Sequence, residues 1–313
     1  MIENQRWSRP VRAFAVFVLI SLAAAPRASS ATPDACRELE VKLQLIKPQI
    51  TSIETNQVLF ASADNGCSEL ARRLLSDGAS LEARDRIGAM PLAHAARAGA
   101  TALAELFLQS GAAIDARNLA GSTALYQAAE NGRTDTVDLL LRKGADPNLP
   151  GRSGVTPLAA AAYRGNDAII ALLLAHRADP ALADTTGKTP IVYAAARGFA
   201  PIVQQLLDAG VKADATYAND LTALMWAAGH DEGVDPRAIE AVIRLLLDRG
   251  APIDAADNRG RTALMIGAER GDVAVVTALL DRGADSLHRD KLGKSAFDLT
   301  ASAPLRAKLS EQN

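Results

Sequence analysis

The chain has 313 residues, of which 49% are hydrophobic and only 4% aromatic, and its formal net charge is −2 at pH 7. This length allows two ordinary domains or one elongated domain, and the apolar content excludes a globally disordered chain. The charge excludes a uniformly basic nucleic-acid-binding protein, although it does not exclude a local basic face.

Residues 1–31 have the three parts of a secretory signal peptide. Three arginines precede an apolar run over residues 13–25, and small residues follow at 28–31. An uncleaved membrane anchor is the alternative, but this run is shorter than the roughly 20 residues that a membrane-spanning helix needs. We therefore predict cleavage after Ala31 and a periplasmic or secreted protein with no membrane span after processing. Cleavage removes four arginines and one glutamate, so the mature protein is more acidic than the whole chain.

Residues 32–56 are predicted to cap the front of the fold. Their apolar spacing fits either a helix from Asp34, as the N-cap, to Lys47 or a strand. Cys36 in this segment and Cys67 beyond it are the only cysteines. In an oxidising compartment such a pair is a disulfide candidate, worth roughly 3–4 kcal/mol by loop-closure entropy. Two unlinked buried thiols are the alternative.

Glycines recur every 33 residues through most of the remaining chain, as at Gly88, Gly121, Gly154 and Gly187. Each unit between them predicts two short helices and a turn. An alanine pair on the first helix lets its neighbour approach closely, and a leucine pair on the second fills the seam between units. A further glycine after the leucines is typical of a left-handed helix stop. Five threonines stand where a hydroxyl caps the first helix: Thr123, Thr156, Thr189, Thr222 and Thr262.

These residues resemble the pattern of the ankyrin repeat family, G-x-T-P-L-H-x-A-A-x-x-G followed by an apolar helix and L-L-x-x-G-A-D. The segment from Gly154 to Gly165 reads GVTPLAAAAYRG. The resemblance runs from about Gln57 to the end of the chain. It implies an all-α solenoid of about seven to eight helix-turn-helix repeats with short hairpin loops over residues 57–293. Residues 294–313 are then a partial repeat that caps the back.

The chain departs from that family pattern in three ways. Arg177 stands where the fourth repeat should close with glycine, which costs roughly 1 kcal/mol if the left-handed turn is kept. The sixth repeat carries a seven-residue insertion near 229–236, whose Gly, Asp and Pro residues predict an exposed loop and not a longer helix. The family's histidine is replaced in every repeat, so apolar contacts are expected in its place: Ala93, Tyr126, Ala159, Val192, Met225 and Met265.

The sequence predicts no catalytic site, no metal site and no cofactor. It has neither a nucleophile elbow nor a phosphate-binding loop. Its four histidines fall at non-equivalent places without metal-ligand spacing: His94, His176, His230 and His288. The one polar cluster, His230 with Asp231, Glu232 and Asp235, is interpreted as a solvated loop in preference to a metal site.

The family resemblance implies that partners bind the concave face made by hairpin tips and first helices. Cations dominate the positions that would project there, which predicts a basic face suited to an acidic protein surface or an anionic polymer. Arginines that only confer solubility are the alternative. The candidate partner-binding residues are Arg97, Arg117, Arg152, Tyr163, Arg164, Lys188, Arg197, Arg259, Arg261 and Arg270.

Repeats four to six are predicted to hold the binding hot spot. There Tyr163 is interpreted as a contact residue, whereas Tyr193 and Trp226 are interpreted as core. We predict a monomeric, non-enzymatic scaffold that holds a partner protein, and no nucleic acid, in the cell envelope. A secreted effector that binds proteins of another cell is the alternative. An enzyme is the weakest interpretation, because no polar groups converge.

Overall fold

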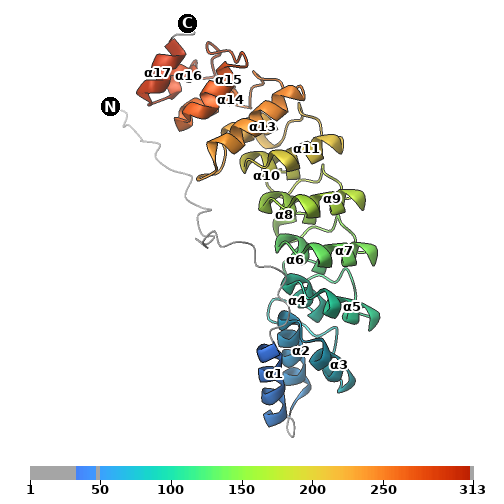
Figure 1. The fold of residues 1–313 in the computed structure, drawn as a ribbon. Helices are drawn as coiled ribbons and strands as arrows, with labels where there is room; N and C mark the ends of the chain where they lie inside the picture. Colours follow the sequence, from blue (N-terminus) through green and yellow to red (C-terminus); the bar gives the residue numbers. More distant parts are fainter. Residues whose placement is uncertain (1–32, 47–49, 311–313) are drawn as a thin grey trace, which may run out of the picture.

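The computed structural model of the chain describes residues 33–46 and 50–310, and these form a curved stack of helix pairs (Figure 1). The described part contains seventeen α-helices, two single 3₁₀ turns and no strand, so the predicted all-α class is confirmed. None of its helices has the length and apolar character required to span a membrane. The predicted signal peptide, residues 1–31, lies outside the described residues.

Eight consecutive helix pairs make up the stack, in agreement with the predicted seven to eight repeats. The first helices of the pairs are α2 (Ser52–Asn65), α4 (Pro91–Ala98), α6 (Ala124–Glu130), α8 (Pro157–Arg164), α10 (Pro190–Ala196), α12 (Ala223–Ala228), α14 (Ala263–Arg270) and α16 (Ala296–Leu299). Figure 1 shows α4, α6, α8 and α10 on the inner side of the curve. The second helices lie behind them: α3 (Ser68–Ser76), α5 (Thr101–Gln109), α7 (Thr134–Arg142), α9 (Asp167–Ala175), α11 (Ala200–Asp208), α13 (Pro236–Asp248), α15 (Val273–Leu280) and α17 (Ala303–Ser310).

Each helix packs on the corresponding helix of the next repeat, so the core runs along the whole stack. The alanine pairs of the first helices are fully buried, which lets neighbouring backbones come close. The first leucine of each pair on the second helices is also buried and fills the seam: Leu74, Leu140, Leu206, Leu246 and Leu279. No single pair encloses its own apolar face, so stability comes from neighbours.

The threonine caps form as predicted in four of the five repeats. The hydroxyls of Thr123, Thr156, Thr222 and Thr262 each accept a hydrogen bond from the amide three residues later. Thr189 is the exception, because it occupies the N-cap position of α10 but its hydroxyl makes no capping bond. The side chains that replace the family's histidine are all buried, so packing contacts replace those of the histidine, as expected.

The fourth repeat closes with Arg177 in the left-handed region, at φ 65°, as the sequence suggested. Glycine adopts this conformation without the steric penalty that a Cβ brings. Asn148 of the preceding repeat donates to the Arg177 carbonyl, which helps to hold the turn. The strain is therefore built into one repeat boundary near the middle of the stack.

Arg177→Gly is expected to raise the free energy of unfolding by about 1 kcal/mol, because it removes the left-handed strain. Gly210 provides the reciprocal control, since it closes the next repeat at φ 97° and an added Cβ would meet no atom within 4 Å. Gly210→Ala should therefore lower the free energy of unfolding by a similar amount. Urea unfolding of the two variants measures both values. A loss of stability in Arg177→Gly would contradict this explanation.

The front of the stack is a helix, α1 (Pro33–Ile46), which settles the choice between helix and strand. Asp34 lies in its first turn and not at the N-cap position. The predicted disulfide is present and joins Cys36 of α1 to Cys67 at the start of α3, with 5.5 Å between their Cα atoms. α2 begins at Ser52 behind a capping box of Thr51 and Glu54, so the first helix of the stack starts inside the segment 32–56 that was predicted as a cap.

The insertion in the sixth repeat is divided between a loop and a helix. α13 has 13 residues, whereas α5, α7, α9 and α11 have nine each. Asp235 caps α13 by accepting a hydrogen bond from the Arg237 amide, and Pro236 follows at the first helical position. The expectation of a loop in place of a longer helix was therefore wrong in part. At the back of the stack, the short helices α16 and α17 form the predicted closing partial repeat.

Candidate binding surface

An aromatic–cation cluster lies on the inner side of repeats four to six. We use this name for Tyr163, Lys188, Tyr193, Arg197 and Trp226. The rings of Tyr163 and Tyr193 meet edge to face, with 5.8 Å between their centroids. The Arg197 guanidinium lies 4.6 Å from the Tyr163 centroid, and the Lys188 ammonium lies 4.8 Å from the Trp226 centroid. Such cation–π contacts orient long basic side chains over aromatic faces.

The cluster presents its aromatic groups to solvent to different degrees. Tyr163 is 41% exposed, which fits its predicted contact role. Tyr193 and Trp226 are half-buried, so the prediction that they belong to the core is wrong in part. Tyr193 packs against the core, yet the Lys188 ammonium lies 5.7 Å from its centroid. All three rings therefore belong to one surface.

A hydrogen bond to Asp184 holds Tyr193 in place. Burial raises the pKa of Tyr193, and the hydrogen bond to the Asp184 carboxylate raises it further. Burial opposes ionisation of Asp184, but the Tyr193 hydroxyl and the Lys188 amide outweigh that effect and lower its pKa. The phenol thus stays neutral while the carboxylate stays charged at neutral pH.

The predicted basic residues fall into two groups. Four have acidic partners: Arg97 bonds Asp64 at 2.7 Å, Arg261 bonds Asp257 and Glu269 at 2.9 Å each, Arg259 lies 4.0 Å from Asp257, and Arg197 lies 3.8 Å from Asp231. The other five make no ion pair within residues 33–46 and 50–310: Arg117, Arg152, Arg164, Lys188 and Arg270.

This division was not visible in the sequence. Asp64 ends the first helix of the preceding repeat, 33 residues before Arg97, and Asp231 lies in the insertion. Asp64 occupies the same repeat position as Arg97, one repeat earlier, whereas Asp231 lies outside the regular repeat positions. Carboxylates therefore neutralise Arg97 and Arg261. Four of the five basic residues without an ion pair in the described part of the chain belong to repeats three to five, and the fifth, Arg270, belongs to repeat seven.

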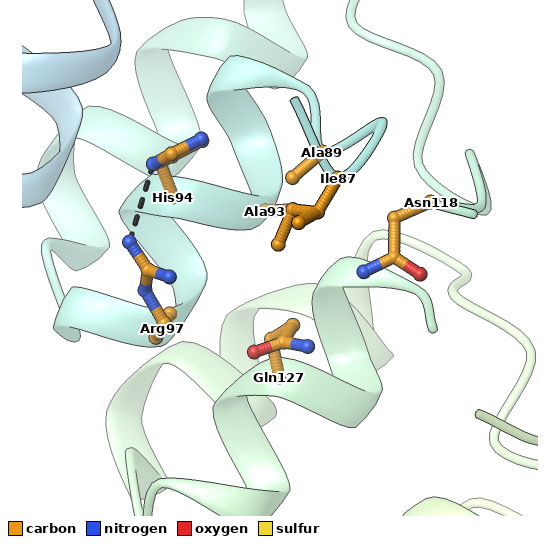
Figure 2. A pocket seen from close by; sticks show the side chains of 7 residues that line it. All are labelled: Ile87, Ala89, Ala93, His94, Arg97, Asn118 and Gln127. Carbon is orange, nitrogen blue, oxygen red and sulfur yellow. Dashed lines mark hydrogen bonds between the residues drawn. The ribbon is translucent and has the colours of Figure 1, made fainter. Parts of the chain in front are cut away.

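Sequence analysis also missed a buried network at His94. The two ring nitrogens of His94 lie 3.0 Å from Asp64 and 3.1 Å from Asp85, and its ring stacks on Phe60. Figure 2 shows His94 and Arg97 projecting from α4, beside a small depression that Gln127 of α6 and Asn118 also line. The available signal was its register, because His94 occupies the same helix position as Tyr193 and Trp226. The network joins the first two repeats.

The insertion loop is anchored and is not simply solvated, which corrects the prediction for it. His230 is buried, and its Nε2 lies 2.8 Å from a carboxylate oxygen of Asp272 in the next repeat. The Asp231 amide donates to the carbonyl of Ala196 in the preceding repeat. In the part of the chain that the structure describes, no three His, Cys, Asp or Glu side chains are grouped to hold a metal ion.

Acid is expected to weaken this anchor. Burial opposes ionisation of Asp272, but hydrogen bonds from His230 and the Val275 amide outweigh it and lower the pKa of Asp272. A depressed carboxyl pKa stabilises the fold above the unfolded value of about 3.9, and the contribution is lost as pH falls through the folded pKa. Asp272→Asn, which keeps the cap of α15, should cost about 1–2 kcal/mol at neutral pH.

Unfolding of native chain and Asp272→Asn at a series of pH values measures this contribution. The difference between the two free energies of unfolding should be constant at neutral pH and should shrink below about pH 4. A difference that persists unchanged in strong acid would show that the carboxylate charge is not its source.

A family model described as "Ankyrin repeats (3 copies)" matches five overlapping stretches of the chain, at residues 58–151, 92–184, 125–217, 158–236 and 193–290. Together these stretches cover well over half of the sequence. No curated protein matches the chain.

Proposed function

Because the chain belongs to the ankyrin repeat family, whose members generally mediate protein–protein interactions and are typically not enzymes, we propose that it binds a partner protein with an acidic surface. The partner occupies the concave side of repeats three to seven, and the aromatic–cation cluster forms the centre of the contact. The chain acts by holding this partner and performs no catalysis.

The observation that carries this proposal is the group of five basic side chains without an acidic partner in the described residues. Arg117 and Arg152 belong to the hairpins before α6 and α8, and Arg164 and Arg270 end α8 and α14. Lys188 adds a fifth charge within the cluster. Elsewhere on this face arginines are neutralised by nearby carboxylates, as at Arg261. Unneutralised cations beside exposed aromatic rings are typical of binding hot spots, where Tyr, Trp and Arg are enriched.

We also propose that the protein acts outside the cytoplasm, in the cell envelope or after secretion. The signal-like residues 1–31 support export, and the Cys36–Cys67 disulfide supports an oxidising compartment. A scaffold in the envelope and an effector that binds proteins of another cell share these features. Fractionation of the envelope from the culture medium, followed by detection of the processed chain, distinguishes the two.

Capture of the partner should weaken as salt concentration rises. Attraction between the exposed cations and an acidic surface is screened over about 10 Å at 0.1 M salt. The tagged protein is incubated with extract of its host cells at increasing ionic strength, and each retained protein is quantified by mass spectrometry. The specific partner should be retained at low salt and lost progressively. Retention that does not depend on salt would contradict the basic-face proposal.

A further inference from the structure

Three buried polar side-chain atoms lack a close hydrogen-bond partner in the described part of the chain, and all three belong to the fifth and sixth repeats. They are Thr189 Oγ1, the Tyr217 hydroxyl and Trp226 Nε1. Burial raises the pKa of Tyr217, and a hydrogen bond with the Thr189 hydroxyl partly offsets this, so these two hydroxyls serve each other as partners. A buried donor left unsatisfied costs stability, and such atoms are rare in native proteins. The indole N–H of Trp226 is therefore the donor for which an acceptor is missing.

Other repeats show which acceptor is missing. His94 and Tyr193 occupy the same position of their helices as Trp226, and each bonds the carboxylate of an aspartate nine residues earlier, in its own hairpin. These aspartates are Asp85 and Asp184. Nine residues before Trp226 the chain has Tyr217. The hairpin of the sixth repeat therefore offers the indole N–H no carboxylate.

The presence of Tyr217 in place of an aspartate also changes the backbone of this hairpin. In the hairpins that keep the aspartate, such as Asp184, one carboxylate oxygen accepts the amides two and four residues later. At Tyr217 these bonds are absent, and the turn instead places Asn219 and Asp220 at φ 63° and 61°. Positive φ is unfavourable for residues other than glycine. The turn without the aspartate therefore carries a backbone cost that the aspartate-containing turns avoid.

Lys188 already places a positive charge beside Trp226, where it can attract a carboxylate. The Lys188 ammonium lies 4.8 Å from the Trp226 centroid, and Lys188 directly precedes Thr189. Lys188 makes no ion pair in the described residues, and Asp184 of its hairpin is engaged by Tyr193 and by three donors of the turn. A carboxylate that pairs with Lys188 would reach the edge of the indole ring.

We propose that the seam between α10 and α12 is a recognition slot for a carboxylate side chain of an acidic protein segment. Lys188 supplies the charge, and the indole N–H of Trp226 supplies the hydrogen bond that a hairpin aspartate would otherwise accept. The slot rests on the proposed function and narrows it, because it names the group on the partner that this chain reads. Since the indole N–H is shielded in the unbound chain, binding moves Lys188 relative to the ring.

Exchange of Tyr217 tests the slot directly. Tyr217→Asp provides the missing carboxylate from within the chain, as Asp184 does, and should compete with an external one. Tyr217→Asn is the matched control, because it also removes the ring and forms the turn as Asn118 does, but carries no charge. A fluorescein-labelled oligo-glutamate peptide is the probe, and oligo-glutamine is its uncharged control. Anisotropy should show about tenfold weaker binding of oligo-glutamate to Tyr217→Asp than to Tyr217→Asn.

A second pair of variants keeps Tyr217. Lys188→Gln should weaken oligo-glutamate binding about tenfold, whereas Lys188→Arg should largely retain it. The full chain carrying Trp7→Phe has Trp226 as its one tryptophan, so its fluorescence reports the slot. Oligo-glutamate should change that fluorescence in the Trp7→Phe chain and not when Tyr217→Asp is added.

The results of these binding experiments distinguish the carboxylate slot from the wider proposal of a basic partner-binding face. Equal binding of oligo-glutamate by Tyr217→Asp, Tyr217→Asn and Lys188→Gln would overturn the slot and leave the basic face standing. The slot is also overturned if oligo-glutamine binds as well as oligo-glutamate, if native chain binds neither, or if inorganic phosphate alone gives the same Trp226 response. Failure of the proposed function appears elsewhere, as partner capture that is insensitive to salt.

Discussion

Reduction of the Cys36–Cys67 disulfide is expected to release α1 from the front of the stack while the repeats from α5 onward stay folded. No described side chain of α1 is fully buried, and its apolar contacts are the half-buried Leu39 and Leu43. The ion pair between Glu40 and Arg73 is largely exposed and adds little. The disulfide closes a long loop, so its removal should cost roughly 3–4 kcal/mol at this end of the chain.

The effect should stay local, because each repeat of a solenoid depends mainly on its neighbours. Hydrogen exchange measures it region by region. Amides of α1 should exchange roughly two to three orders of magnitude faster after reduction, those of α2 and α3 less so, and those beyond α5 at an unchanged rate. The double variant Cys36→Ser with Cys67→Ser is the control and should show no further response to reductant. Undiminished protection of α1 after reduction would contradict the anchoring role of the disulfide.

Much of the fold could be predicted from the sequence because the repeat imposes the same local solution many times. A threonine cap, a buried alanine pair and a leucine seam each follow from spacing alone. Arg177 shows how strong this constraint is, since it adopts the left-handed conformation of the glycines it replaces. Where the period breaks, prediction weakened. The start of α2 at Ser52 precedes the first glycine of the pattern, and the extension of α13 arises within the insertion.

The binding surface was harder to predict, because charge is neutralised between repeats. Arg97 lies in the last turn of its first helix, as Arg164 and Arg270 do, and Arg261 occupies the same repeat position as Lys188. Of these residues, only Arg97 and Arg261 have carboxylates within 3 Å. Their partners come from another repeat or from within the turn. The division of aromatic residues into core and contact was also too sharp for Tyr193 and Trp226, which are half-buried. A ring at this helix position has one edge in the core and a face open to the neighbouring cations.

Reversal of three exposed arginines on the concave side is expected to abolish partner capture. Arg152, Arg164 and Arg270 make no ion pair in the described residues, so changing them to glutamate breaks no ion pair and removes only the cation–π contact of Arg164 with Tyr163. The partner's acidic surface would then face repulsion in place of attraction, and affinity should fall roughly a hundredfold. The control reverses three exposed arginines of the second helices, Arg142, Arg237 and Arg244, and produces the same net charge. Two of these arginines form exposed ion pairs within their helices, with Asp138 and Glu240, and such pairs contribute little to stability.

The partner site on the concave face is tested most directly by quantitative capture from host-cell extract. The native chain, the concave triple variant and the second-helix triple variant are compared. Circular dichroism first establishes that all three proteins keep the same helix content. Native chain and the second-helix variant should retain the same partner, and the concave variant should lose it. Retention by the concave variant, or equal loss from both variants, would contradict a partner site on the basic concave face.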